Sequence, residues 1–315
     1  QGDEMTVTAT DHSVASGREG LNVLVRNKRG GSGPPVLFVH GATYPSTIMF
    51  DYPVDGVSWL DWMADQGFDA WCVDLLGYGG ADRPPEMQQA AEANGPIVDT
   101  AEAVGDVKRV IDFILAERGV GQLDLLGYSW GTAIGGQVAG DMPEKIRRLV
   151  LAGALWLRSG NVQIAVPGQL GAYRTVDADA IVNRWTVDLD DAQRKAIAPA
   201  ERLRDWAEAA VATDPESVRH DPPRLRAPTG VVKDVQQHWL KGDPTYDPGR
   251  IRCPTMVVVG EWDRETTPEQ GLEVFSRLTG TAERRFTMIG GGTHSLLLEN
   301  QRHQLRDVVA GWLSG

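Results

Sequence analysis

Short apolar runs recur along the chain and are separated by stretches that mix apolar and charged positions. Residues 5–10 and 21–27 alternate between apolar and polar side chains, which predicts a pair of antiparallel strands at the start. Later runs predict further strands, and the continuous apolar run at 34–41 is typical of a strand that is covered on both faces. These runs comprise residues 34–41, 68–74, 122–129, 148–154, 254–263 and 284–291.

Helical patterns lie between these runs. From Val98 to Arg118, apolar side chains recur at three- and four-residue spacing, so that they form one face of a helix. Strands that alternate with helices are typical of the α/β class, and we therefore expect a mostly parallel sheet flanked by helices. Further helices are predicted at residues 59–67, 131–142, 268–278 and 296–313.

Residues 156–240 interrupt this alternation. The segment has few strand-like runs, many Asp, Glu and Arg residues and several prolines, and stretches such as 199–212 have a helical pattern. We therefore expect a helical cap that is inserted after the sixth core strand. Residues 1–155 and 241–315 would then form the core.

The sequence Gly-Tyr-Ser-Trp-Gly at 127–131 places a serine between two glycines, where a buried strand meets a helix. So tight a turn leaves no room for side chains at the flanking positions, which accounts for the glycines. It exposes the Ser129 hydroxyl and directs the N-terminus of the next helix toward it, where backbone N–H groups can stabilise an oxyanion. This setting favours a nucleophile elbow over a glycine-rich turn with a solvated serine.

A serine hydroxyl is a weak nucleophile and needs a base, together with an acid that orients the base. Among six histidines, His294 lies between the last strand and the last helix, where an open sheet can return a base to the elbow. Asp263 directly follows the preceding strand, and Glu261 and Glu265 are nearby alternatives. We expect Ser129, His294 and Asp263 to form a catalytic triad.

The order of these three residues along the chain resembles that of the α/β-hydrolase family, and differs from the orders of chymotrypsin and subtilisin. The resemblance extends over nearly the whole chain outside the insertion. It implies the α/β-hydrolase fold, with the insertion in the place where capped members of the family carry a helical lid.

The resemblance also implies an oxyanion loop and a structural loop. The segment HGATY is similar to the family's oxyanion loop, so the backbone N–H groups of Ala42 and Trp130 would bind the oxyanion. His40 would shape this loop without moving protons. The segment at 73–84 resembles the family's D-x-x-G-x-G-x-S, with Ala81 where serine is usual; this segment is structural in most members.

Tryptophans and arginines of the insertion are the candidates for substrate binding. Each tryptophan could line an apolar pocket or belong to the small core of the cap, and each arginine could bind a substrate carboxylate or face solvent. The candidates are Trp156, Trp185, Trp206, Trp239, Arg158, Arg174 and Arg184. We expect Trp156, Trp185, Trp239 and Arg158 to contact the substrate.

These residues predict a carboxylic-ester hydrolase that acts through an acyl-enzyme. Chain length and the spacing of the three catalytic positions are similar to those of monoalkyl phthalate hydrolases, which implies an aromatic half-ester as substrate.

The alternatives are a meta-cleavage C–C hydrolase, a proline iminopeptidase and a ligand receptor on a hydrolase scaffold. The iminopeptidases share the Ser-Trp-Gly elbow, but their oxyanion loop is rich in glycine and proline, unlike HGATYPS here. Ser129 excludes dehalogenases and epoxide hydrolases, which use a carboxylate nucleophile.

Composition narrows the classes further. The formal net charge of -12 over 315 residues and the lack of a basic cluster argue against a nucleic-acid partner. Cys72 and Cys253 are too few and too far apart for a disulfide framework, and no metal-ligand spacing or phosphate-binding motif implies a metal or a cofactor. No apolar stretch or signal-peptide pattern suggests a membrane, so we expect a cytoplasmic protein acting on a small ester. A homodimer is left open.

Overall fold

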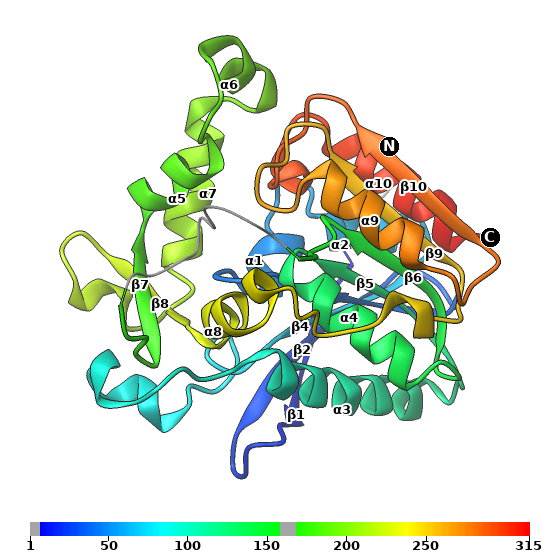
Figure 1. The fold of residues 1–315 in the computed structure, drawn as a ribbon, viewed down its shortest axis with the longest axis horizontal. Coiled ribbons are helices and arrows are strands. Elements are labelled where there is room, and N and C mark those ends of the chain that lie inside the picture. The colour runs from blue at the N-terminus through cyan, green and yellow to red at the C-terminus, as the bar shows by residue number, and fades with distance from the viewer. Residues whose placement is uncertain (1–6, 158–167) are drawn as a thin grey trace.

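The computed structural model describes residues 7–157 and 168–315 and is built around one eight-stranded sheet (Figure 1). The strand order is β1-β2-β4-β3-β5-β6-β9-β10. β1 and β2 run antiparallel to their neighbours, and all later strands of this sheet are parallel. The predicted fold class is therefore confirmed. The strands are β1 (Thr10–Ala15), β2 (Asn22–Arg29), β3 (Pro35–Val39), β4 (Asp69–Asp74), β5 (Leu123–Tyr128), β6 (Ile146–Ala152), β9 (Thr255–Gly260) and β10 (Arg284–Ile289).

The sheet separates two apolar clusters. In β3, Leu37 packs into one cluster and Phe38 into the other, and Leu125 and Leu126 of β5 divide in the same way. This alternation is the pleat of a strand that is buried on both faces, as the uninterrupted apolar runs predicted. One face is covered by α3 (Thr100–Arg118), α4 (Trp130–Asp141) and α9 (Pro268–Arg277), and the other by α1 (Ser46–Phe50), α2 (Trp59–Asp65) and α10 (Arg302–Leu313).

Two predicted elements differ in their bounds. The first strand lies later than residues 5–10, because the segment that pairs with β2 is the one in which Thr10 lies opposite Asn27. The final helix is divided into a short 3-10 turn at Leu296–Leu298 and α10. Glu299 separates them, and its side chain turns back to Thr293. Other 3-10 turns are Pro85–Gln88, Ala91–Ala93, Ser217–Arg219, Trp239–Lys241 and Pro248–Arg250.

The insertion follows β6 and differs from the expected all-helical segment in one respect. Its helices are α5 (Ala178–Trp185), α6 (Asp191–Ile197), α7 (Ala200–Val211) and α8 (Gly230–Gln237), but β7 (Tyr173–Asp177) and β8 (Arg224–Pro228) form a two-stranded antiparallel sheet. Both strands carry charged residues, so neither forms the apolar run from which a strand is predicted. Arg226 of β8 is buried and forms two hydrogen bonds of 2.8 Å with the carboxylate of Asp214.

The elements of the insertion lie in two places. Figure 1 shows α5, α6, α7 and the β7–β8 pair to the left of the main sheet, whereas α8 lies against the core. Val231, Val232 and Val235 of α8 join the same apolar cluster as α3. The Asp234 carboxylate accepts a 2.8 Å hydrogen bond from the backbone N–H of Thr100 at the start of α3. The insertion therefore leaves the sheet after β6 and returns to it through α8.

Candidate active site

The turn between β5 and α4 places Ser129 at the carboxyl edge of the sheet. Ser129 has φ 56° and ψ -119°, a backbone conformation that residues with a side chain rarely adopt. A Cβ atom at Gly127 would lie 2.1 Å from the carbonyl oxygen of Gly131, and one at Gly131 would lie 2.3 Å from that of Val39. Both flanking positions therefore require glycine, as the sequence predicted.

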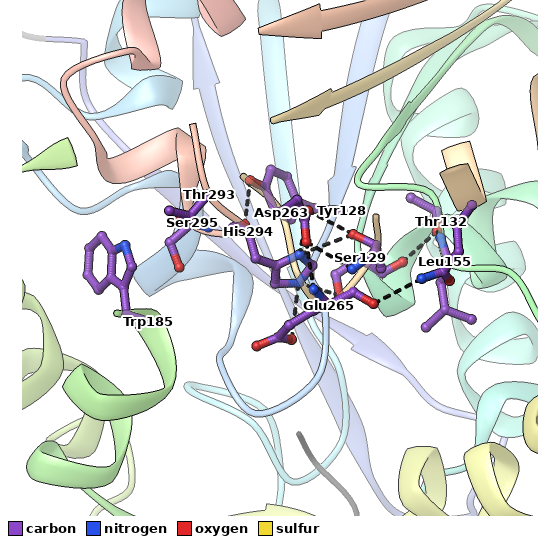
Figure 2. Close-up of polar contacts among 12 residues, drawn as sticks. Tyr128, Ser129, Thr132, Leu155, Trp185, Asp263, Glu265, Thr293, His294 and Ser295 are labelled. Atoms are coloured by element: carbon purple, nitrogen blue, oxygen red, sulfur yellow. Dashed lines mark hydrogen bonds and ion pairs between the residues drawn. The ribbon is translucent and has the colours of Figure 1, made fainter. Parts of the chain in front are cut away.

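A chain of hydrogen bonds connects Ser129, His294 and Asp263 (Figure 2). The Ser129 Oγ lies 2.8 Å from Nε2 of His294, and Nδ1 of His294 lies 2.8 Å from Oδ2 of Asp263. The Asp263 carboxylate accepts further bonds of 2.9 Å from the backbone N–H groups of Glu265 and Thr266 and from the Thr266 hydroxyl. The three residues that the sequence singled out thus meet in one place, and the buried carboxylate is held rigidly toward the imidazole.

The protonation of His294 is controlled by neighbouring carboxylates. Burial disfavours the imidazolium, but the negative charges of Asp263 and Glu265 outweigh it, so the pKa of His294 is raised above its ordinary value. Arg184 opposes this shift. The imidazole is therefore a stronger base than an isolated histidine, and it is suited to take a proton from a hydroxyl.

Neither of the two alternative acids takes the position of Asp263. Glu261 is exposed and accepts a 2.9 Å bond from the backbone N–H of Gly291. Glu265 forms an ion pair with Arg184 of α5, in which Nε and Oε1 are 2.6 Å apart, and its Oε2 is 3.5 Å from Nε2 of His294. Glu265 thus approaches the nitrogen that faces the serine, whereas Asp263 holds the opposite nitrogen.

Ala42 and Trp130, the predicted oxyanion donors, are neighbours of Ser129. Trp130 is the first residue of α4, and the first N–H groups of a helix have no partner within the helix. Its indole is buried and donates a 2.9 Å bond to Thr100 Oγ1, which fixes the start of α4. Ala42 follows Gly41, whose Cβ position would lie 2.9 Å from Ser129 Cβ, so the loop after β3 runs directly beside the serine. That the N–H groups of these two residues bind an oxyanion stays a prediction.

His40 and the loop after β4 support this arrangement. His40 is fully buried; its Nε2 accepts a 3.1 Å bond from the Leu75 N–H, and its Nδ1 is 2.7 Å from the Gly41 carbonyl oxygen. Burial lowers the pKa of His40 to about 4, so the ring is neutral. Asp74 accepts a 3.0 Å bond from Gly80 N–H in the same loop. These contacts are structural, in agreement with the role that the resemblance implied for His40.

Two cavities meet at Ser129. The His294 cavity is lined by Tyr44, Met49, Tyr128, Ile181, Trp185, Val187, Leu189, Trp206, Trp262, Arg264, Thr293, His294, Ser295, Leu297 and Leu298, in addition to Gly41. The Trp239 cavity is lined by Trp130, Leu155, Trp156, Val231, Val235, Trp239, Leu240, Thr266 and Gln270. Four further residues line both cavities: Ala42, Ser129, Arg184 and Glu265.

The candidate pocket residues are divided between these cavities. Trp185 lies in the His294 cavity, while Trp156 and Trp239 lie in the Trp239 cavity, which also receives residues of α8. Arg158 lies outside the described residues. Of the two candidate arginines within the described residues, Arg184 lines both cavities and Arg174 lines neither.

Arg174 contacts the same threonine as Arg184. One of its terminal nitrogens donates to Thr43 Oγ1 in the oxyanion loop, to which Arg184 Nη1 donates at 3.3 Å. Burial and the charge of Arg184 lower the pKa of Arg174 to about 10. Two guanidinium groups of the insertion therefore converge on the loop that precedes α1.

Among the contacts between cap and core that were not predicted, two lie beside His294. The Trp185 indole donates a 2.8 Å bond to Glu299 Oε1, and Glu299 Oε2 accepts a 2.9 Å bond from the N–H of Thr293, next to His294. The pair of Arg184 and Glu265 is the other contact. An acid among leucines in SLLLEN is a signal that could have identified Glu299, because a carboxylate there must be buried with donors.

The described residues were compared with the requirements of a metal site, a disulfide and a membrane-spanning helix, and they meet none of the three. Over 7–157 and 168–315, no three His, Cys, Asp or Glu side chains are grouped as the ligands of a metal ion would be. Cys72 and Cys253 are buried free thiols. None of the described helices combines the length and the apolar character needed to cross a membrane.

Comparison with known proteins identifies the family of this chain. Residues 34–301 match the family model for the alpha/beta hydrolase fold. The chain is 26% identical over 284 residues to a proline iminopeptidase of Neisseria meningitidis serogroup B, covering 82% of this chain and 83% of that protein. This chain belongs to the α/β-hydrolase-fold family and is a hydrolase of that fold.

Solved structures with the same fold have diverse activities. A serine hydrolase involved in carbazole degradation superimposes with a TM-score of 0.65 at 18% identity, covering 98% of this chain and 99% of that one. An esterase from Exiguobacterium antarcticum has a TM-score of 0.63 at 19% identity, with coverage of 97% and 100%. At such identities the likeness concerns the fold alone.

Proposed function

We propose that this chain hydrolyses small carboxylic esters through an acyl-enzyme on Ser129. The observation that supports this most directly is the hydrogen-bond chain from Ser129 Oγ through His294 to Asp263, with two 2.8 Å contacts, between two largely apolar cavities. A nucleophile, a base and an orienting acid in this relation are what acyl transfer requires.

The first half of the reaction forms the acyl-enzyme. Ser129 Oγ attacks the ester carbonyl carbon while His294 Nε2 takes the hydroxyl proton, and the imidazolium is stabilised by Asp263. The negative charge on the carbonyl oxygen is stabilised by the N–H groups of Ala42 and Trp130. The bond between carbon and the alcohol oxygen then breaks, and that oxygen takes the proton from His294.

The second half returns the enzyme to its starting state. A water molecule gives a proton to His294 and attacks the acyl carbon, and the bond to Ser129 Oγ breaks as the serine regains its proton. The products are a carboxylic acid and an alcohol. These steps use serine, histidine and water alone, so the proposal includes no cofactor and no metal.

We propose an aromatic half-ester, such as a monoalkyl phthalate, as the preferred substrate. Two features support this choice: the indoles of Trp156 and Trp239 offer flat apolar surfaces, and Arg184 reaches both cavities. The guanidinium of Arg184, which is paired with Glu265, would have to share its donors with the free carboxylate of a half-ester, a group that a diester lacks.

A proline iminopeptidase is the second candidate, because that relative aligns over most of both chains. Its substrate is an amide with a free N-terminal imino group, which is positively charged. The carboxylates nearest to Ser129 are Asp263, bonded to His294, and Glu265, paired with Arg184. This environment favours the ester of an acid over a cationic amide.

The test is kcat/KM for matched monoalkyl and dialkyl phthalates, simple p-nitrophenyl esters and a proline anilide, with Ser129→Ala as the control. We expect ester turnover that falls on the order of a thousandfold or more in Ser129→Ala, while circular dichroism shows an unchanged fold. Preference for the anilide would favour the iminopeptidase. Equal rates on monoester and diester would remove recognition of the carboxylate and leave a general carboxylesterase.

A further inference from the structure

The two cavities are sides of one reaction centre. Ala42, Ser129, Arg184 and Glu265 line both, and the ion pair of Arg184 with Glu265 lies between the remaining walls. An ester whose carbonyl carbon is at Ser129 Oγ therefore has two directions in which its halves can extend. The two directions differ, because the two cavities are lined by different residues.

His294 distinguishes the two directions. It lines the His294 cavity together with Thr293 and Ser295 but is not among the residues that line the Trp239 cavity, which Thr266, a neighbour of His294 Nδ1, lines instead. The leaving oxygen must lie within hydrogen-bond distance of His294 Nε2, because that nitrogen returns the proton. The alcohol half that is attached to this oxygen must therefore extend into the His294 cavity.

The acyl half then extends on the other side of the carbonyl carbon. This direction leads along Trp130, whose N–H is a proposed oxyanion donor, to Trp156 and Trp239. Resting on the proposed esterase activity, we propose that the Trp239 cavity is the acyl subsite and the His294 cavity is the alcohol subsite. The substrate class is an ester of a flat aromatic acid with an aliphatic alcohol.

The walls of the two cavities differ in composition. The Trp239 cavity combines Trp130, Trp156 and Trp239 with Leu155, Val231 and Val235, a set that suits an aromatic ring. Besides Ser129, the uncharged polar residues of its wall are Thr266 and Gln270. The His294 cavity mixes aliphatic and aromatic side chains, and its aliphatic residues can take an alkyl chain: it is lined by Met49, Ile181, Val187, Leu189, Leu297 and Leu298 together with Tyr44, Tyr128, Trp185, Trp206 and Trp262.

The assignment has a kinetic consequence. When the carbon–alcohol bond breaks, the alcohol leaves from the His294 cavity and the acyl group remains on Ser129 in the Trp239 cavity. Hydrolysis of the acyl-enzyme therefore depends on the walls of the Trp239 cavity. The alkyl-binding walls of the His294 cavity affect only the earlier step, in which the acyl-enzyme forms. Selectivity for the alcohol and selectivity for the acid are separable by mutation.

The experiment uses one added ring in each cavity. Val187→Phe narrows the His294 cavity and Leu240→Phe narrows the Trp239 cavity; Val187 is half-buried and Leu240 is 39% exposed, so both positions can accept a larger side chain. Ile181→Phe and Val235→Phe are a second, more buried pair. Thermal melts establish that each variant is folded.

Two substrate series are measured with full-length enzyme: alkyl benzoates from methyl to hexyl, and p-nitrophenyl esters from acetate to benzoate. We expect Val187→Phe to reduce the preference for hexyl over methyl benzoate by about tenfold while the deacylation rate constant from burst kinetics stays within about twofold. Leu240→Phe should instead reduce the preference for benzoate over acetate by about tenfold and alter deacylation of the benzoyl-enzyme.

The opposite pattern, or equal effects of both variants on both series, overturns the assignment of the cavities. A wild-type protein that cleaves no ester of either series overturns the proposed function instead. The two failures are therefore distinguishable, because only the second abolishes the burst of p-nitrophenol.

Discussion

The core and the insertion contribute to the site by different means. In the core, Ser129 is held by backbone contacts that leave no room for a methyl group at Gly127 or Gly131. The insertion reaches the same place through side chains: Ile181 and Trp206 join an apolar cluster of the core, and polar contacts connect Arg184 with Glu265 and Trp185 with Glu299. Close packing of backbone permits one geometry, whereas side-chain contacts across a cavity can be exchanged one by one.

The contrast indicates which part of the site can be altered without loss of the reaction. The proposed triad lies at strand ends of one sheet, so we expect a change in any of its members to disturb the reaction itself. The insertion adds residues of α5, α7 and α8 to cavity walls that the core otherwise forms, and we expect changes in these residues to alter which substrate binds.

Removal of the base or its orienting acid should have the largest effect. We expect His294→Ala to lower kcat/KM for a p-nitrophenyl ester on the order of a thousandfold, and Asp263→Asn to lower it somewhat less, because the triad acts as a unit. Glu261→Gln, in the same turn but exposed, is the matched control and should retain wild-type activity. A crippled Glu261→Gln beside an active Asp263→Asn would show that the acid is misassigned.

Crowding the elbow should reduce stability. A Cβ at position 131 would lie 2.3 Å from the Val39 carbonyl oxygen, so Gly131→Ala should cost about 2–3 kcal/mol in the free energy of unfolding. In α3, a Cβ at Gly105 meets nothing within 4 Å, so Gly105→Ala should gain about 1 kcal/mol from helix propensity. Urea unfolding measures both, and equal values for the two variants would contradict the rigid-core description.

Loss of one contact between cap and core should have a moderate effect. Trp185→Phe retains an aromatic ring but removes the N–H that donates to Glu299 at 2.8 Å. Loss of this hydrogen bond should lower the free energy of unfolding by about 1–2 kcal/mol. We expect KM to rise about fivefold with kcat nearly unchanged, since the chemistry belongs to the core. A kcat that falls in parallel with kcat/KM would mean that the cap positions His294 through Glu299 and Thr293.

The smallest effect concerns pH. The neutral form of His294 is the base, so kcat/KM should rise with pH through its pKa, which lies above the ordinary value partly because of the Glu265 charge. Glu265→Gln removes this charge and releases Arg184, whose positive charge lowers the same pKa. The acidic limb of the profile of kcat/KM against pH should therefore move to lower pH in Glu265→Gln. Glu261→Gln is the control, and its acidic limb should stay in place. A limb that stays in place would exclude an electrostatic effect of Glu265.

Sequence reasoning succeeded where local rules determine structure. Gly127 and Gly131 around Ser129, and the positions of Asp263 and His294 after strands, follow from turn geometry and strand order. The cap was harder, because β7 and β8 carry charged residues and depend on Arg226 bonding Asp214, a contact between residues on different elements. For the same reason no pattern identified Glu265 or Glu299 as contacts of the cap. Such pairings depend on how the insertion docks on the sheet, which periodicity does not describe.

The positive φ of Ser129 has a consequence for protein engineering. A non-glycine residue in this conformation costs about 1–3 kcal/mol, which glycine would recover. Heat treatment of a random library, followed by selection of whatever stays folded, would therefore enrich Ser129→Gly, a variant with a higher melting temperature and no hydroxyl. Directed evolution of a more durable enzyme from this chain must score turnover in every round, because the residue proposed as the nucleophile is also one whose replacement by glycine would stabilise the fold.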